Sequence, residues 1–512
     1  MKFVKNIVFC SLFLAFSLIL EAQLTVPKLV VCITVDQLRS DYLQYFSSTF
    51  GEKGFKRLMN EGLYYRSVDF GFSNLSESSS IASIYTGTYP YYNGISGDMR
   101  FDWTQEKAVS IVHDINFMGN YTTDRVSPLA LQTTTIGDIL KKASNGSSKV
   151  YSVAPNAGAA LLSAGRWANA AFWLDDVNGK WATSTYYKDV PNYVERFNTS
   201  EAIGNYPERT WEQSYSYYNE FPYSQRTTPF SYRFSQKEKD AYTRIKKTPL
   251  INSEITNLAN RFFENARFTR NTTPDFLALT YYAGNYPYAT DSTEYNYEIQ
   301  DIYYRLDKEM EKLIDLIDRK IGLKHVLIVL SSTGYYDELP NWSSDYKPFG
   351  TFYPDRCTSL LNMYLMAIYG EGNWVKTYFD RYIFLNKKLA EEKKVNWKDL
   401  LLNAADFVSQ FSGIQSISIP ELSHEIHPGI YRKNAGDLFI EIQSSWAFDG
   451  MQTQRKKNVL SPLFFFGEQI HKEQVTRKVK ATEIAPSIAY LLRIAPPDNC
   501  IDLPLAEILK SH

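Results

Sequence analysis

Three continuous apolar stretches stand out along the chain, and each is rich in β-branched or aromatic residues. They cover Leu29 to Val35, Phe276 to Tyr282 and His325 to Leu330. Runs of this length without polar alternation are typical of strands buried on both faces, as in a parallel sheet. The first run ends at Asp36, so we expect this carboxylate at the carboxyl edge of the sheet.

A helical pattern separates the second and third strands. Apolar residues recur at spacings of three and four from Ile299 to Ile317, and Gly322 then ends the pattern. Strand, helix and strand with connections of this length predict an α/β fold with a doubly wound, mostly parallel sheet. Ligands of such sheets bind at the carboxyl edge, which here gathers Asp36 and the loops at 76–80, 283–291 and 331–338.

The periodicity weakens between about residues 165 and 265, where polar and Tyr-rich segments prevail. We interpret this region as a cap inserted over the carboxyl edge and not as a separate folding unit. Ordinary α/β signals return in an apolar run at 460–467 and a helical pattern at 483–492. Residues 23–512 are therefore expected to form one domain that carries an inserted cap.

The overall composition narrows the class of protein. Hydrophobic residues make up 44% and charged residues 22% of the 512 positions, which is enough to bury a sizeable core and argues against a disordered chain. The formal net charge is −1, from 55 basic and 56 acidic residues. This balance gives no support to nucleic-acid binding or to a basic membrane-binding face.

The N-terminus has the pattern of an export signal. Lys2 and Lys5 precede an apolar run from Ile7 to Leu20, and Ala22 is a small residue at the predicted cleavage point. The run is shorter than the roughly 20 residues that a membrane helix needs, although a retained anchor is the alternative. We expect residues 1–22 to leave as a signal peptide and the mature chain, without a transmembrane segment, to be periplasmic or secreted.

The mature chain holds three cysteines, and their chemistry is open at this point. Cys32 lies within the first strand, where it is expected to pack as a small apolar residue. Cys357 and Cys500 either pair in an oxidising compartment or stay as two thiols. No Cys-x-x-Cys motif or Cys/His cluster indicates a structural zinc site.

Several segments together resemble the alkaline phosphatase superfamily. They are KLVVCITVDQLRSDYL, GFKRLMNEG, SIYTGTYPYYNGISGD, TPDFLALTYY, YYRLDKEMEKLIDLID, RCTSLLNMYLMAIYG and TEIAPSIAYLLRIAPPDNCIDLPL. They are most similar to the bacterial branch with a threonine nucleophile, which is related to the nucleotide pyrophosphatases/phosphodiesterases. The resemblance implies an α/β/α core, two zinc ions at the carboxyl edge, and hydrolysis of phosphate esters through a phospho-threonine.

The same resemblance predicts which positions hold the functional residues. Asp36 matches a metal-binding aspartate. Glu77 stands at the position of the nucleophilic threonine, and Asp98 at that of an asparagine. The other expected Lys, Arg, Asp and His positions are occupied by Asn156, Gly158, Asn285, Ala289, Thr333, Gly334 and Leu460.

These substitutions predict a loss of catalysis. Zinc takes three or four N, S or O ligands, and the two-metal mechanism needs both ions to clamp the reacting oxygens. We expect Asp36, Glu77 and Asp98 to converge, and two like charges 4 Å apart repel by about 4 kcal/mol at an effective dielectric of 20. A phosphate dianion would enter against this repulsion. The sequence therefore favours a pseudophosphatase that binds a periplasmic protein or a glycan, with no zinc.

Two alternatives stay open. The first is a phosphomonoesterase or phosphodiesterase with a rearranged metal site, in which Ser78 is the nucleophile; otherwise the serines around Glu77 cap a helix. The second is a single Ca²⁺ or Mg²⁺ held by oxygen atoms of Asp36, Glu77 and Asp98. The other interpretation is that Glu77 takes part in a structural hydrogen bond or replaces a lost metal contact. Asp337 follows the 331–336 loop and is expected to be a solvated charge.

Overall fold

The computed structural model describes residues 26–187, 190–214, 229–289, 296–338, 349–423, 426–443, 445–449 and 455–510. The predicted signal peptide and most of the Tyr-rich segment at 210–226 lie outside these residues.

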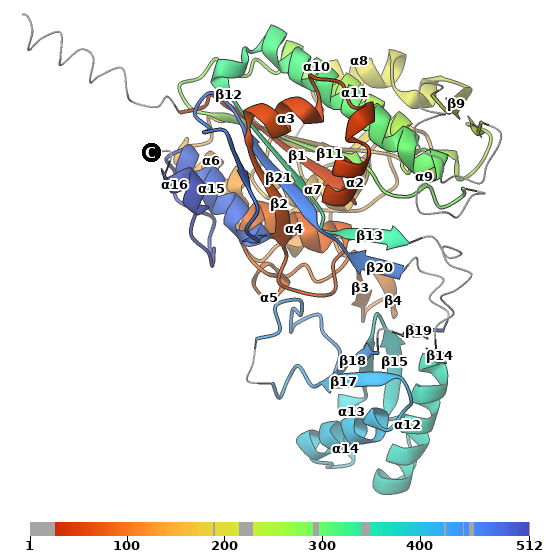
Figure 1. The fold of residues 1–512 in the computed structure, drawn as a ribbon. Helices are drawn as coiled ribbons and strands as arrows, with labels where there is room; N and C mark the ends of the chain where they lie inside the picture. Colours follow the sequence, from red (N-terminus) through yellow and green to blue (C-terminus); the bar gives the residue numbers. More distant parts are fainter. Residues whose placement is uncertain are drawn as a thin grey trace, which may run out of the picture.

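A large, mostly parallel sheet forms the centre of the molecule (Figure 1). Its path is β22 (Glu473–Val475), β2 (Leu63–Asp69), β21 (Ser461–Phe466), β12 (Val326–Ser332), β1 (Leu29–Asp36), β11 (Asp275–Tyr282), β6 (Val150–Ala154), β7 (Ala170–Leu174), β8 (Trp181–Ser184) and β5 (Gly119–Asn120), and β23 (Val479–Lys480) also pairs with β2. The predicted α/β fold is confirmed, and so are the three buried strands.

Strand β1 lies between β11 and β12 and runs parallel to both. All of its residues are buried, as the absence of polar alternation in its sequence predicts. The register pairs Asp36 with Tyr282 and Val35 with Ser332. The three strands therefore end at the same level, so the loops that follow them meet beside Asp36.

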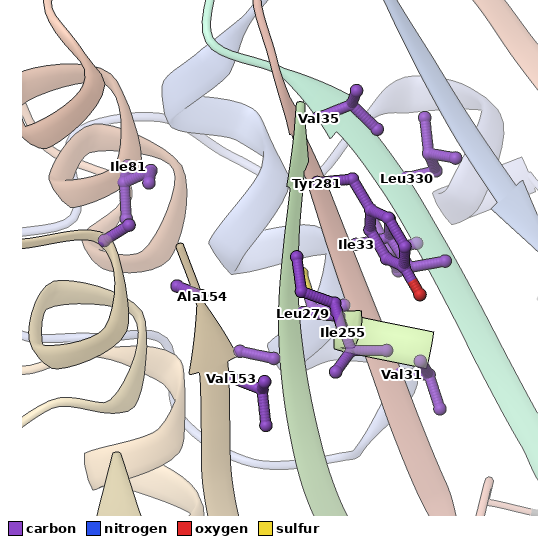
Figure 2. Close-up of a cluster of buried hydrophobic side chains, with 14 of the residues drawn as sticks. Val31, Ile33, Val35, Ile81, Val153, Ala154, Ile255, Leu279, Tyr281 and Leu330 are labelled. Carbon is purple, nitrogen blue, oxygen red and sulfur yellow. The ribbon is translucent and has the colours of Figure 1, made fainter. Parts of the chain in front are cut away.

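Helices cover both faces of the sheet (Figure 1). One face carries α2 (Ser40–Tyr45), α3 (Phe55–Glu61), α10 (Pro249–Asn265) and α11 (Tyr297–Lys320), and the other carries α4 (Glu77–Thr86), α6 (Ile136–Ala143), α7 (Ala157–Ala164) and α15 (Ile484–Leu491). Figure 2 shows part of this core, which includes Ile255 of α10, Ile81 of α4 and Val31 of β1. Burial of these side chains stabilises the sheet by roughly 1.5–3 kcal/mol each.

The region expected to form a cap differs from that expectation. Strands β7 and β8 extend the central sheet, and α10 packs on β11 as part of a main helical layer. The hairpin of β9 (Glu208–Glu212) and β10 (Ser231–Ser235) does lie over the 283–289 loop, because Trp211 and Tyr232 pack on Tyr286. Most of the segment therefore belongs to the core. The sequence pattern did not indicate this, because the short apolar strands stand within Tyr-rich surroundings.

A second, smaller unit is formed by residues 349–449, which we call the accessory lobe (Figure 1). Its four-stranded sheet has the order β15 (Val375–Phe379), β16 (Tyr382–Leu385), β18 (Leu438–Ile442) and β17 (Ile414–Ser418). Helices α12 (Pro354–Tyr369) and α14 (Trp397–Ser409) pack on it and enclose a hydrophobic core of their own, which includes Leu361, Trp374 and Leu400.

A two-stranded antiparallel ribbon connects the accessory lobe to the main body. It consists of β13 (Tyr335–Glu338), which leads out of the sheet after β12, and β20 (Arg455–Asn458), which leads back to β21. A second contact is the hairpin of β3 (Met99–Asp102) and β4 (Lys107–Ser110), whose Phe101 packs against Phe384 of the lobe. The main body also contacts the lobe where the N–H of Tyr91 donates to the carbonyl oxygen of Pro428 and Asn74 donates to that of Gly429.

The cysteines are unpaired in the described residues. Cys32 and Cys357 are buried in the cores of the main body and the accessory lobe, and Cys500 lies beside Gly87. The open question of a Cys357–Cys500 disulfide is thus answered by two free thiols. Within the described residues, no helix combines the length and the apolar character needed to cross a bilayer.

Candidate functional site: a carboxylate cluster at the carboxyl edge

Asp36 occupies the centre of the site, at the end of β1, and is buried. Its Oδ1 accepts a hydrogen bond of 2.9 Å from the hydroxyl of Thr333, and its Oδ2 lies 3.4 Å from Nε2 of Gln37. The Thr333 hydroxyl accepts a bond in turn from the backbone N–H of Gln37 (2.9 Å). The carboxylate that the resemblance matches to a metal ligand is therefore bound to protein donors.

Asp337 joins the site from β13. Its Oδ2 accepts a hydrogen bond of 3.0 Å from Nε2 of Gln37, and its N–H donates to Oε1 of the same side chain (2.9 Å). Asn285 donates to its carbonyl oxygen (2.8 Å) and accepts from the hydroxyl of Tyr336 (2.7 Å). The expectation of a solvated Asp337 is wrong, because this network holds the residue in a buried position.

The N-terminus of α4 places Glu77 and the serines. Ser76 is the N-cap, and it exchanges capping hydrogen bonds with Ser79, which confirms the capping role predicted for the serine cluster. Glu77 is the first helical residue, and its Oε2 accepts a hydrogen bond of 2.8 Å from Nδ2 of Asn156. The structural hydrogen bond expected as one role of Glu77 is present.

Asp98 lies beside the first turn of α4. Its Oδ1 accepts a hydrogen bond of 2.9 Å from the backbone N–H of Ser78, and its Oδ2 lies 3.5 Å from Nζ of Lys456 on β20. Gly158 lies so close that a Cβ atom there would come within 2.9 Å of the Ser78 hydroxyl. Ser78 thus faces a small neighbour and fixes Asp98 through its backbone.

The site combines negative charge with limited access to water. Burial raises the pKa of Glu77 to about 7, and the carboxylates of Asp36 and Asp98 add to this effect. Burial also raises the pKa of Asp337. The pKa of Asp98 is lowered although its side chain is partly buried, because Lys456 and the N–H of Ser78 stabilise the ionised form. These carboxylates interact electrostatically and form one cluster.

Two tyrosine rings border this cluster, and each has a lysine over its face. Nζ of Lys456 lies 4.9 Å from the ring centroid of Tyr335, and Nζ of Lys247 lies 4.7 Å from that of Tyr282. Burial raises the pKa of Tyr335, and all four carboxylates of the cluster contribute to the shift. The four acids therefore all interact electrostatically with this tyrosine.

The residues present do not fit a pair of zinc ions. Three positions where the resemblance expects ligands hold other residues. Thr333 donates a hydrogen bond to Asp36, and Asn285 donates one to Asp337 of β13. The side chain of Leu460 is exposed. In the part of the chain that the structure describes, no three His, Cys, Asp or Glu side chains form a set that could hold a metal ion. The alternative of a single Ca²⁺ or Mg²⁺ on Asp36, Glu77 and Asp98 likewise finds no such set among the described residues.

Sequence reasoning missed Lys247 and Lys456, and it considered Asp337 but expected it to be solvated. Asp337 and Lys456 are cross-strand partners in the ribbon, and their approach depends on a pairing between distant segments. Lys247 lies just before α10, within the region interpreted as a cap. Tyr335 to Glu338 shows no alternation of apolar and polar residues, so no local pattern indicated this strand or the face that carries Asp337.

Comparisons with known proteins agree with this fold and its order of segments. A family model described as type I phosphodiesterase / nucleotide pyrophosphatase matches residues 30–462. A protein of Myroides odoratus named as a calcium-transporting ATPase is 29% identical over 97% of both chains. The alkaline phosphatase PhoV of Synechococcus elongatus is 27% identical over 94% of this chain and 93% of its own.

A solved structure is similar over the same extent. The crystal structure of the alkaline phosphatase PafA superposes with a TM-score of 0.77, at 24% identity, over 94% of this chain and 99% of that chain. The resemblance inferred from the sequence segments is confirmed: the chain belongs to the type I phosphodiesterase / nucleotide pyrophosphatase family of the alkaline phosphatase superfamily.

Proposed function

We propose that this protein is an exported, non-hydrolytic member of its family and acts by binding. The observation that carries the proposal is the state of Asp36, whose Oδ1 accepts a hydrogen bond from Thr333 where the family's chemistry requires a metal contact. Two-metal catalysis needs ions that polarise the ester and neutralise developing charge. The carboxylate cluster carries charge of the same sign as a phosphate dianion, so substrate binding is opposed as well.

The test is a metal and activity measurement on the purified mature chain. We expect no stoichiometric zinc and no hydrolysis of an aryl phosphate monoester or diester above the level of Asp36→Asn. Zinc near two equivalents, together with turnover that Asp36→Asn abolishes, would overturn the proposal. The partner, a periplasmic protein or a glycan, belongs to the same proposal, and crosslinking in the periplasm is its test.

A second candidate function is a hydrolase with a rearranged metal site, which the similarity to alkaline phosphatases over nearly the whole chain favours. In that case Ser78 or Glu77 would carry the reaction. Ser78→Ala is a clean test, because the backbone N–H that holds Asp98 is retained and the hydroxyl alone is lost. Turnover that survives Asp36→Asn but is lost in Ser78→Ala would establish this alternative.

A further inference from the structure

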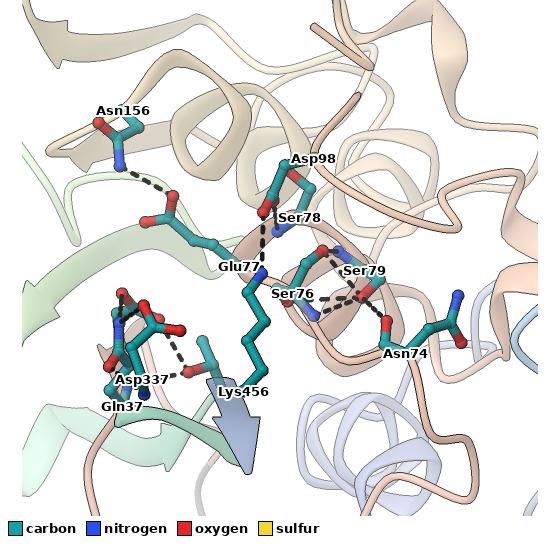
Figure 3. Close-up of polar contacts among 12 residues, drawn as sticks. Gln37, Asn74, Ser76, Glu77, Ser78, Ser79, Asp98, Asn156, Asp337 and Lys456 are labelled. Carbon is teal, nitrogen blue, oxygen red and sulfur yellow. Dashed lines mark hydrogen bonds and ion pairs between the residues drawn. The ribbon is translucent and has the colours of Figure 1, made fainter. Parts of the chain in front are cut away.

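The charges of the site are unbalanced. Four carboxylates belong to it, those of Asp36, Glu77, Asp98 and Asp337, and two lysines approach them, Lys247 and Lys456. The formal excess is two negative charges. Like charges held together in a partly desolvated site repel, and a bound cation relieves this repulsion. Figure 3 shows Glu77, Asp98, Asp337 and Lys456 around the same region.

One carboxylate oxygen in this cluster lacks a donor. Asp337 is 9% exposed, and its buried Oδ1 has no hydrogen-bond partner among the described residues, whereas its Oδ2 is bound by Gln37. Lys456 is its direct cross-strand neighbour, yet the Lys456 ammonium lies at Asp98. A buried acceptor without a donor is costly, so this oxygen marks a place where a ligand donor would be stabilised.

The protein already shows how it binds an ammonium group here. Lys456 and Lys247 each place an alkylammonium over a tyrosine face, at 4.9 Å from Tyr335 and 4.7 Å from Tyr282. Tyrosine faces attract cations through their quadrupole, and carboxylates supply charged acceptors. The same two kinds of group, ring faces and carboxylates, recognise organic ammonium ligands in general.

We propose that the carboxylate cluster binds a small alkylammonium ligand of the diamine class, with Asp337 and Glu77 as acceptors for its ammonium groups. This inference rests on the proposed function and names the ligand class of the same site. A primary ammonium offers three N–H donors and one positive charge, and a diammonium matches the formal excess of two. A bare metal ion fits less well, since the described carboxylates do not form a metal-binding set.

The binding test uses titration calorimetry on the mature chain with 1,4-diaminobutane, butylamine and inorganic phosphate as probes. We expect saturable one-to-one binding of the diamine, weaker binding of butylamine and none of phosphate. Raising the salt concentration should weaken diamine binding, because added ions screen the attraction. No saturable heat with the diamine, or stronger binding of phosphate, would overturn the proposal.

Isosteric variants locate the ligand. Asp337→Asn and Glu77→Gln each remove one charge-assisted acceptor and retain the existing bonds to Gln37 and Asn156. We expect each to weaken diamine binding about tenfold. Glu391→Gln is the matched control, since it removes the same charge from an exposed position of the accessory lobe. An equal loss in the control would show unspecific attraction and contradict the proposed site.

The two proposals fail in different ways. Absence of diamine binding in a chain without turnover would reject the ligand class and leave the non-hydrolytic function standing. Zinc-dependent ester turnover would reject the proposed function whatever the diamine does. Circular dichroism of each variant establishes whether it is folded. The two acceptor variants are independent, so if one of them does not fold, the other still tests the site.

Discussion

At the scale of single residues, Glu77 shows how the site departs from a phosphate-binding centre. A helix N-terminus favours a negative charge at its first residue. Burial and the neighbouring carboxylates outweigh this effect, and they raise the pKa of Glu77 to about 7. The residue therefore changes its charge near neutral pH, at the position where the sequence resemblance predicts a nucleophile.

This shift predicts a pH-dependent stability. The folded pKa lies above the ordinary value of 4.5, so the stabilisation is fully present below pH 4.5 and is lost as the pH rises through about 7. Glu77→Gln cannot titrate. From pH 5 to pH 8 we expect the wild type to lose on the order of 2 kcal/mol relative to this variant. Urea unfolding at both pH values measures the difference; parallel curves for the two proteins would contradict it.

The sequence located part of the site for a physical reason. Asp36 and Glu77 follow directly from a strand end and a helix start, which local patterns predict well. Asp337 and Lys456 come together through strand pairing, and Lys247 through the packing of α10, so no local pattern indicates them. The sequence alone led us to expect no cationic side chain in the site, and Lys247 and Lys456 show that this expectation was wrong.

At the scale of elements, the strongly periodic segments were predicted closely. The apolar runs became β1, β11 and β12, and the spacing of three and four became α11. Their burial on both sides of the sheet explains the uniform apolar pattern. The short strands β7 and β8 were missed, because four or five residues within polar surroundings give little periodicity.

The Thr333 hydroxyl, directly after β12, is bonded to Asp36 at the end of β1, and this contact yields a second prediction. Thr333→Val keeps the side-chain shape but leaves Asp36 Oδ1 and the Gln37 N–H without this buried partner. We expect a loss of about 2 kcal/mol in the free energy of unfolding, measured in urea. Thr333→Ser keeps the hydroxyl and should lose less. Equal stability of the wild type and the valine variant would show that the bond is not stabilising.

At the scale of the whole molecule, the main body and the accessory lobe have separate cores. The lobe was not separated from the main domain by sequence reasoning. Its helices and strands resemble those of the main body in composition, and its chain leaves and returns within the same continuous α/β pattern. The boundary is defined by which apolar side chains pack together, and this is a property of the tertiary fold.

Separate cores predict separate stabilities. Leu400 is fully buried in the lobe, so Leu400→Ala should destabilise the lobe by about 3 kcal/mol through a lost contact and a cavity. Hydrogen exchange should accelerate in α12 and α14 and stay unchanged in β1 and α4. Leu402→Ala, on the same helix but 42% exposed, is the control. Faster exchange throughout the main body would show that the two units unfold together.

The ribbon of β13 and β20 has a mechanical consequence. It carries the chain to and from the accessory lobe, and it also supplies Asp337 and Lys456 to the carboxylate cluster. A tilt of the lobe about this hinge therefore displaces an acid and a base of the site together. A partner that binds the lobe would therefore change the geometry of the cluster. A ligand bound between Asp337 and Lys456 would in turn restrict the motion of the ribbon.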